Sequence, residues 1–374
     1  MQDTSVSETA AVDAPAAAPT SHVVLSVDAM GGDLGPAAVV AGVAKVAQSM
    51  SDVQFLLHGR SLDLTRLVQR YKLEDRVTIR PCDGVVTMDD RPSQVMRHGE
   101  GTSMWSAIEA VRSGEATVVV SCGNTGALMA LSVLRLRRLP GVNRPAIACL
   151  WPSRNPAGFN VMLDVGADVK AEANDLLQYA LMGVSYARNG LDVARPRVGV
   201  MNVGTEEHKG RAELRQALDM ISDVAEAGQF DCVGFVEGSD LPSDRVDVIV
   251  TDGFTGNVAL KTGEGTARLV ADMLRASYKA TPLSRLAALV SLGVIRRLRK
   301  RMDPRRVNGG VFLGLNGTVV KSHGASDGTG VAAALELAVQ LARSEFSTRL
   351  AARVAGAADA MAAAAAKAAA GTGK

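Results

Sequence analysis

Residues 22–46 read HVVLSVDAMGGDLGPAAVVAGVAKV, an apolar run, a loop with glycines and a longer apolar run. The first run has the β-branched composition of a strand, and the second has the length of a helix. A strand that enters a helix through a glycine loop can expose backbone N–H groups to an anion. The loop fits neither G-x-G-x-x-G nor a P-loop, and a carboxylate, Asp28, closes the strand.

The same alternation of short and long apolar runs continues along the chain and predicts an α/β fold. We expect a doubly wound, mostly parallel sheet with flanking helices. Further strands are expected at 53–57, 76–79, 116–121, 161–164, 198–203, 247–252 and 318–321. Helices are expected at 103–112, 126–138, 175–187 and 331–343.

The composition bounds the class of protein. With 374 residues, of which 47 % are hydrophobic, the chain can bury a sizeable core, whereas 3 % aromatic residues and a net charge of +2 argue against a nucleic-acid surface. The cysteines are scattered without C-x-x-C spacing, which predicts reduced thiols, a cytoplasmic protein and no metal centre. We expect a disordered tail over 1–20, an α/β core over 21–352 and an alanine-rich tail over 353–374.

Strand-like runs repeatedly end in a small polar residue with glycine close by. Such residues commonly supply only turns and helix caps. Ligands, however, bind beyond the carboxyl ends of strands in these sheets, so loops of this kind gathered on one edge indicate a crevice for an anionic substrate. The loops are VDAMGGD (27–33), SCGNTG (121–126), DVGAD (164–168), NVGTEEHKG (202–210), TDGFTGN (251–257) and KSHGASDG (321–328).

Cationic side chains in these loops suit phosphate or a polarised carbonyl oxygen. Lys209, Lys261 and Lys321 are candidates, and an ion pair with a neighbouring acid is the alternative for each. We expect Lys261 to begin a helix that faces the crevice, and His323 to contact substrate. Residues 324–328 match G-x-S-x-G, but no histidine follows Ser326, which argues against a serine hydrolase.

The segment 282–302, PLSRLAALVSLGVIRRLRKRM, combines an apolar helical stripe with a basic end. Its uncharged stretch is too short to span a bilayer, which needs about 20 apolar residues. Such a helix can lie on an anionic membrane or dock an acidic protein, and packing in a dimer interface is the alternative. The expected contact residues are Leu286, Leu289, Val290, Leu292, Arg296, Arg297, Arg299 and Lys300.

Taken in order, "VDAMGGDLGP", "SCGNTGALMA", "LDVGAD", "NVGTEEHKG", "DVIVTDGFTGNVALKTGEG" and "GLNGTVVKSHGASD" resemble the PlsX family of bacterial phosphate acyltransferases. The likeness runs from about residue 23 to residue 342. It implies a fold akin to phosphate acetyltransferases and isocitrate/isopropylmalate dehydrogenases, and a homodimer at the membrane periphery. The implied reaction makes acyl phosphate from acyl-acyl-carrier protein and inorganic phosphate without a cofactor. The product would feed a membrane glycerol-3-phosphate acyltransferase in phospholipid synthesis.

The resemblance and the loop positions together assign site residues. We expect phosphate to attack the thioester directly, N–H groups and a lysine or histidine to hold the oxyanion, and His323 to protonate the leaving thiolate. Asp28 orients the donors or accepts a proton from phosphate. The expected catalytic residues are Asp28, Lys209, Asn257, Lys261 and His323. The expected phosphate- or thioester-binding residues are Gly31, Gly32, Asn124, Thr125, Gly126, Asp164, Asn202, Asp252, Gly256 and Ser322.

Three alternatives remain at this point. A phosphate acetyltransferase-like enzyme would share the chemistry and take acyl-CoA. A metal- and NAD-dependent dehydrogenase would use the related fold, although the dinucleotide fingerprint is absent from the sequence. A non-catalytic membrane scaffold would use the basic helix and leave the polar loops unexplained.

Overall fold

The computed structural model describes residues 23–206, 208–294, 309–353 and 356. Its strands form an 11-stranded sheet in the order β3-β2-β1-β4-β11-β10-β5-β6-β9-β7-β8. The strands are β1 (Val23–Asp28), β2 (Val53–Gly59), β3 (Val77–Pro81), β4 (Val118–Ser121), β5 (Ala146–Pro152), β6 (Phe159–Leu163), β7 (Arg197–Met201), β8 (Asp231–Val236), β9 (Val248–Val250), β10 (Gly310–Leu313) and β11 (Thr318–Lys321). The mostly parallel α/β sheet predicted from the sequence is confirmed.

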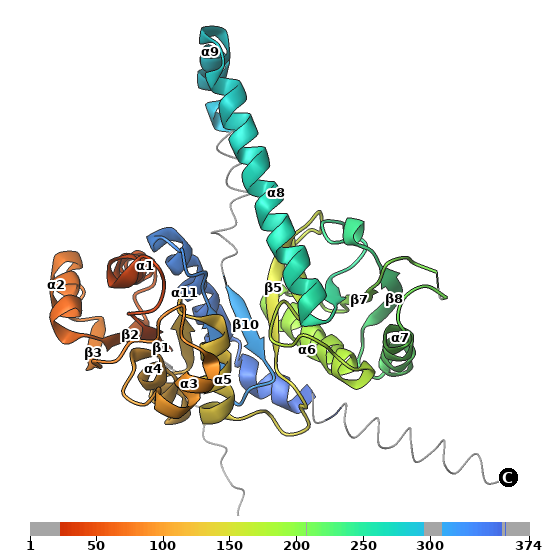
Figure 1. Cartoon of the computed structure of the whole chain (residues 1–374), viewed down its shortest axis with the longest axis horizontal. Coiled ribbons are helices and arrows are strands. Elements are labelled where there is room, and N and C mark those ends of the chain that lie inside the picture. The colour runs from red at the N-terminus through yellow and green to blue at the C-terminus, as the bar shows by residue number, and fades with distance from the viewer. Residues whose placement is uncertain (1–22, 207, 295–308, 354–355, 357–374) are drawn as a thin grey trace, which may run out of the picture.

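Helices cover both faces of this sheet (Figure 1). They are α1 (Gly35–Ser49), α2 (Ser61–Tyr71), α3 (Pro92–His98), α4 (Ser103–Arg112), α5 (Thr125–Leu136), α6 (Ala173–Leu191), α7 (Ala212–Val224), α8 (Gly253–Lys279), α9 (Pro282–Val290) and α11 (Gly328–Arg343). Successive side chains of β4 point to opposite faces of the sheet. Val118 and Val120 pack in the core under α1 and α11 on one face, and Val119 packs in the core under α4 and α5 on the other.

The strands run in two directions. β1, β2, β3, β4 and β11 are parallel to one another, and so are β6, β7, β8 and β9. Between these groups, β10 is antiparallel to both β11 and β5, and β5 is antiparallel to β6. The two parallel groups therefore point in opposite directions, so the polar loops do not all follow strands of one direction.

Strand register nevertheless brings the carboxyl ends of β11 and β6 together. Gly310 of β10 pairs with Lys321, the last residue of β11, while its neighbour Val311 pairs with Ala148 of β5. The next residue of β5, Cys149, pairs with Met162 near the end of β6. The carboxyl ends of β11 and β6 therefore lie at the same height along the sheet. β10 and β5 lie between them and join the two parallel groups.

Helix α8 projects from the body of the molecule and carries α9 at its far end (Figure 1). It begins at Gly253, where the side chain of Asp252 accepts a hydrogen bond from Thr255 N–H (2.7 Å). The expectation that Lys261 begins a helix is wrong, because Lys261 lies two turns inside α8. Within the described residues no helix has the length and apolar content needed to cross a bilayer.

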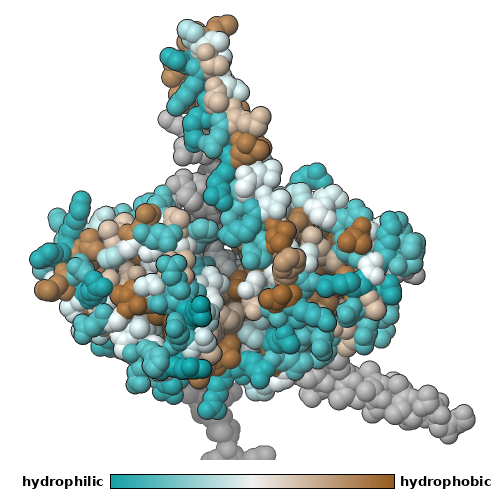
Figure 2. Space-filling model, in the orientation of Figure 1, coloured by the Kyte–Doolittle hydropathy of each residue, from teal (hydrophilic) through white to brown (hydrophobic). Residues whose placement is uncertain are grey.

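The apolar part of the 282–302 segment is described as α9 and the residues after it. Its apolar side chains, Leu286, Leu289, Val290 and Leu292, are exposed. Apolar and polar residues alternate along the projecting helices in the space-filling view (Figure 2). The expected basic contacts Arg296, Arg297, Arg299 and Lys300, and nearly all of both tails, lie outside the described residues.

Candidate functional site

A cavity of about 470 Å³ lies where the two groups of strands meet. Its wall combines polar and apolar side chains, and the apolar ones come mainly from β5 and α8. The polar lining residues are Thr125, Asn257, Lys261, Glu264, Lys321, Ser322 and His323. The apolar ones are Ile147, Cys149, Leu150, Trp151, Pro152, Val165, Leu260 and Ala267, and glycines 166, 263, 309 and 310 complete the wall.

Asp28 is fully buried under the loop that follows β1. Its carboxylate accepts hydrogen bonds from the hydroxyls of Ser103 (2.7 Å) and Ser121 (2.7 Å), and burial raises its pKa although these bonds oppose the shift. Gly31 and Gly32 lie against the loop after β4, and a side chain at Gly32, where φ is +93°, would be strained. In this structure Asp28 fixes the glycine loop and is not among the cavity-lining residues.

Asp164 fixes the second group of loops in a similar way. Its buried carboxylate accepts from Ile147 N–H (2.9 Å) and from the N–H groups of 166–168 at 2.8 to 3.2 Å. Helix α8 begins directly on this loop, since a Cβ at Gly256 would lie 1.9 Å from the Asp164 carbonyl oxygen. Asp164 and Gly256 therefore position α8, and neither lines the cavity.

The first turn of α5 faces the cavity. The side chain of Asn124 caps the helix by accepting a first-turn N–H (3.0 Å), and its Nδ2 donates to the carbonyls of Met88 (2.8 Å) and Asp90 (3.0 Å). Thr125 lines the cavity, whereas Asn124 and Gly126 do not. Because the first N–H groups of a helix lack intrahelical acceptors, this turn can bind an anion.

Two predicted residues of α8 face the cavity. Lys261 Nζ pairs with Glu264 (3.0 Å) one turn away, and Asn257 lies beside Gly166 of the loop after β6. Within the described part of the chain, the side-chain amide of Asn257 has no hydrogen-bond partner. Asn257 can therefore bind a ligand without losing a hydrogen bond, whereas a ligand on Lys261 shares its ammonium group with Glu264.

The loop after β7 holds two further predicted residues outside the cavity lining. Lys209 is exposed and pairs with Glu206 (2.7 Å), as the alternative interpretation of this lysine holds. Asn202 is buried, and its Nδ2 donates to the Lys209 carbonyl (3.1 Å). Its Oδ1 accepts no hydrogen bond from any residue that the structure describes. Arg211, at the start of α7, pairs with the predicted residue Asp252. This loop thus contacts the base of α8.

The loop after β11 brings Ser322 and His323 to the cavity. The Ser322 hydroxyl donates to Ser326 Oγ (3.1 Å), and His323 Nδ1 accepts from Ala325 N–H (3.2 Å). Partial burial, together with the nearby charge of Lys261, lowers the pKa of His323. The imidazole is therefore neutral at pH 7 and carries its hydrogen on Nε2.

The β5 wall was not found from the sequence. Trp151 packs so closely on α8 that a Cβ at Gly263 would lie 2.6 Å from the indole. Cys149 is the one residue of a catalytic type in the apolar run of β5, and its spacing from the other cysteines did not mark a site. The sequence identifies Lys321 as a cation in a polar loop, but it is not among the residues expected to bind substrate. Its position at the end of a strand is the feature that could have placed it in the site.

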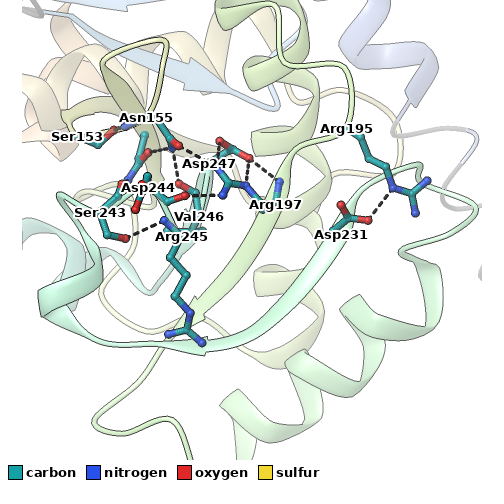
Figure 3. Close-up of polar contacts among 11 residues, drawn as sticks. Ser153, Asn155, Arg195, Arg197, Asp231, Ser243, Asp244, Arg245, Val246 and Asp247 are labelled. Carbon is teal, nitrogen blue, oxygen red and sulfur yellow. Dashed lines mark hydrogen bonds and ion pairs between the residues drawn. The ribbon is translucent and has the colours of Figure 1, made fainter.

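A polar network holds the β5–β6 hairpin in place (Figure 3). Asp247, just before β9, binds the Arg197 guanidinium at 2.9 Å, and Arg197 Nη2 donates to Asn155 Oδ1 (2.8 Å) in the turn between β5 and β6. Asn155 Nδ2 in turn donates to the Val246 carbonyl (2.8 Å). The network therefore supports the strand that forms the apolar wall of the cavity.

Among the residues described, no group of three or more His, Cys, Asp or Glu side chains is arranged to hold a metal ion. The cysteines at 82, 122, 149 and 232 are free thiols.

Comparison with solved structures supports the fold. The EutD phosphotransacetylase from Staphylococcus aureus matches with a TM-score of 0.55 and 13 % identity over 86 % of this chain and 94 % of that chain. A phosphotransacetylase from Streptococcus pyogenes matches with a TM-score of 0.55 and 17 % identity over 87 % of this chain and 93 % of that chain. At such low identity these matches show the architecture alone.

Comparison of sequences shows the family. The model of the family described as "Fatty acid synthesis protein" matches residues 23–349. A phosphate acyltransferase of Cereibacter sphaeroides is 68 % identical over 345 residues, which cover 92 % of this chain and 94 % of the relative. One from Paracoccus denitrificans is 68 % identical over 334 residues, which cover 89 % and 90 %. The chain thus belongs to the fatty acid synthesis protein family, the PlsX family, and is a phosphate acyltransferase.

Proposed function

We propose that this enzyme transfers an acyl group from acyl-acyl-carrier protein to inorganic phosphate. The acyl phosphate would then be consumed by a membrane glycerol-3-phosphate acyltransferase in phosphatidic acid synthesis. The observation that carries the proposal is the composition of the cavity wall, which combines cationic and N–H groups with apolar side chains. The polar groups suit phosphate and the apolar side chains suit a fatty thioester.

The proposed chemistry is a direct displacement. A phosphate oxygen attacks the thioester carbonyl carbon, the new C–O bond forms a tetrahedral oxyanion, and collapse of this intermediate breaks the C–S bond. The proton of monohydrogen phosphate moves to the leaving thiolate, so the carrier leaves as a free thiol. Positioning both substrates in one cavity and stabilising the oxyanion supply most of the rate in such reactions.

Side chains of the cavity take distinct roles in this mechanism. His323 Nε2–H and Lys261 donate to the oxyanion, and Asn257 and Ser322 orient the thioester. A neutral imidazole is a weak acid, so we replace the expected thiolate protonation by His323 with hydrogen-bond donation. Positioning roles suit the residues that fix the surrounding loops: Asp28, Asp164, Asp252, Gly31, Gly32, Gly256, Asn124, Gly126, Asn202 and Lys209.

A covalent acyl-enzyme is not part of this mechanism. Cys122 is the cysteine of the SCGNTG loop, and burial raises the pKa of its thiol, which disfavours the nucleophilic thiolate. Cys122→Ala should therefore retain turnover. Isolation of an acyl group on Cys122 after rapid quenching would contradict direct displacement.

The decisive assay incubates purified protein with long-chain acyl-acyl-carrier protein and labelled phosphate in metal-free buffer. Labelled acyl phosphate, trapped by hydroxylamine as the hydroxamate, is the expected product. A parallel reaction with acyl-CoA of the same chain length identifies the donor. A kcat/KM that favours acyl-CoA would contradict the carrier-protein assignment while leaving the phosphate acyltransferase activity intact.

We further propose a homodimer that associates with the membrane surface. The middle of α8 exposes Leu269, Val270, Met273 and Leu274, and a second copy is the partner that we infer for this stripe. Sedimentation should show a dimer that the double variant Leu269→Glu/Met273→Glu converts to a monomer. A wild-type chain that sediments as a monomer at micromolar concentration would exclude this assembly.

A further inference from the structure

Lys321 has an unusual environment for a lysine. It is 9 % exposed, lines the cavity, and donates from Nζ to the carbonyl oxygens of Cys122 (3.4 Å) and Ser322. Within the described residues no carboxylate lies at ion-pairing distance from its ammonium group. A buried cation that lacks a paired anion is costly, so such a group commonly serves a ligand or changes its protonation state.

Charged groups surround Lys321 without neutralising it. Asp28 on β1 and Asp33 in the following loop attract it only from a distance, and the carboxylate of Asp28 is already bound by two serine hydroxyls. Lys261 on α8 repels it across the cavity, and the Cys122 thiol and His323 lie close by. Burial is the largest of these effects, and the pKa of Lys321 is lowered to about 8.

The first turn of α5 adds positive potential at the same place. Nζ contacts the carbonyl of Cys122, three residues before Thr125, and Thr125 also lines the cavity. N–H groups of a helix start and a lysine ammonium group are both donors that bind phosphate oxygens. Lys261 on α8 is a second cation of the cavity wall and is paired with Glu264, which also lines the cavity.

We propose that Lys321 is a catalytic residue that binds the phosphate substrate, which lies between its ammonium group and the first turn of α5. This inference rests on the proposed function and deepens it, because it identifies the group that holds the nucleophile. Phosphate supplies the anion that the buried ammonium group lacks. Its attacking oxygen then faces the apolar part of the cavity, where the thioester lies.

The proposal has a definite pH dependence. Below pH 8 Lys321 is protonated and binds the anion, and above pH 8 the neutral amine loses this attraction. Phosphate KM should therefore rise as pH increases through about 8, and kcat/KM for phosphate should fall. In Lys321→Arg the side chain stays charged, so this alkaline limb should move to higher pH.

The test compares Lys321→Met with Lys45→Met, a control lysine at the surface that contacts Thr329. In Lys321→Met we expect phosphate KM to rise about 10- to 100-fold, as for loss of a charge-assisted hydrogen bond, with the acyl-donor KM little changed. Thermal unfolding of both variants verifies folding. Titration calorimetry with inorganic phosphate alone gives the same comparison without an acyl donor.

The outcomes separate this inference from the proposed function. If wild type makes acyl phosphate and Lys321→Met keeps the wild-type phosphate KM and affinity, Lys321 is not the phosphate-binding group. If wild type makes no acyl phosphate from either donor, the proposed function fails. Calorimetry then still decides the inference: phosphate binding that Lys321→Met abolishes supports it, and absent or unaltered binding overturns it.

Discussion

Asp28 and Asp164 are both carboxylates at strand ends, and both direct their oxygens to hydroxyl or backbone donors of the surrounding loops. Their sequence context suggested contact with substrate. The sequence alone cannot distinguish a carboxylate that fixes a loop from one that contacts substrate, because both occur in the same strand–loop–helix pattern. Residues that reach the cavity, such as Asn257 and His323, come from the same kind of loop.

At the residue scale, His323 carries a testable role. His323→Ala should lower kcat about 10²- to 10³-fold, as expected for loss of one oxyanion donor, and His323→Gln should lower it less because the amide still donates. His98→Ala, at the exposed end of α3, is the control. Unchanged kcat in His323→Ala would remove this residue from the mechanism.

The pH profile adds a second readout for His323. Partial burial and the charge of Lys261 lower the pKa of His323, which favours the neutral imidazole at neutral pH. Protonation puts a hydrogen on Nδ1 and breaks the bond from Ala325 N–H, which orients the ring. The rate should therefore fall on the acid side of neutrality, and this limb should disappear in His323→Gln. An acid limb that stays unchanged in His323→Gln would contradict the assignment.

At the scale of elements, α8 has two functions, since its first turns form a wall of the cavity and its remainder projects from the body. The alternation of apolar runs predicted most strands and helices near their observed bounds, including β11 and α4. It did not predict β5, β8 or β10. Strand direction depends on connections rather than on apolar pattern, so the reversal across β10 and β5 could not be read from the sequence.

Gly263 tests the role of α8 as a wall. In Gly263→Ala the new methyl group would displace the Trp151 indole, and overpacking of this kind costs roughly 1–3 kcal/mol. We expect kcat/KM for long-chain donors to fall about tenfold, with phosphate KM unchanged. Gly265→Ala is the matched control, because a Cβ at Gly265 meets no atom within 4 Å. Equal effects of the two variants would show that Trp151 does not bound the acyl site.

The hairpin network of Figure 3 provides a stability test. Asp247→Ala removes the partner of a partly buried Arg197 and should lower the free energy of unfolding by about 2 kcal/mol. Asp231→Ala breaks the more exposed pair with Arg195 and should change stability little. Urea denaturation measures both. If the two variants lose the same stability, the network does not anchor the β5–β6 hairpin.

At the scale of the whole molecule, the cavity depends on elements from most of the chain. Thr125 follows β4, Gly166 follows β6, Asn257 lies on α8 and Ser322 follows β11. The expected gathering of all the polar loops is met only in part, because the loops after β1 and β7 supply no residue to the cavity wall. The arrangement of the loops that do meet could not be predicted, because it depends on the stagger between oppositely directed strands, which pairing across β10 establishes.

The proposed membrane association also belongs to this scale, because α9 lies at the far end of α8 from the cavity (Figure 1). The double variant Leu286→Glu/Leu289→Glu should abolish cosedimentation with anionic vesicles, since it places charges on exposed apolar positions. Turnover of a soluble acyl donor should be retained. Leu62→Glu, an exposed leucine on α2, is the control. Vesicle binding that survives the double variant would place the membrane contact elsewhere.

Strand β10 has a consequence for how this enzyme can change length during evolution. It is four residues long and, with β5, joins the two parallel groups of the sheet in register. Each inserted or deleted residue would slide one half along the other by about 3.4 Å and turn its side chains to the opposite face. Homologous chains should therefore accept insertions in peripheral loops, while the number of residues in β10 stays constant.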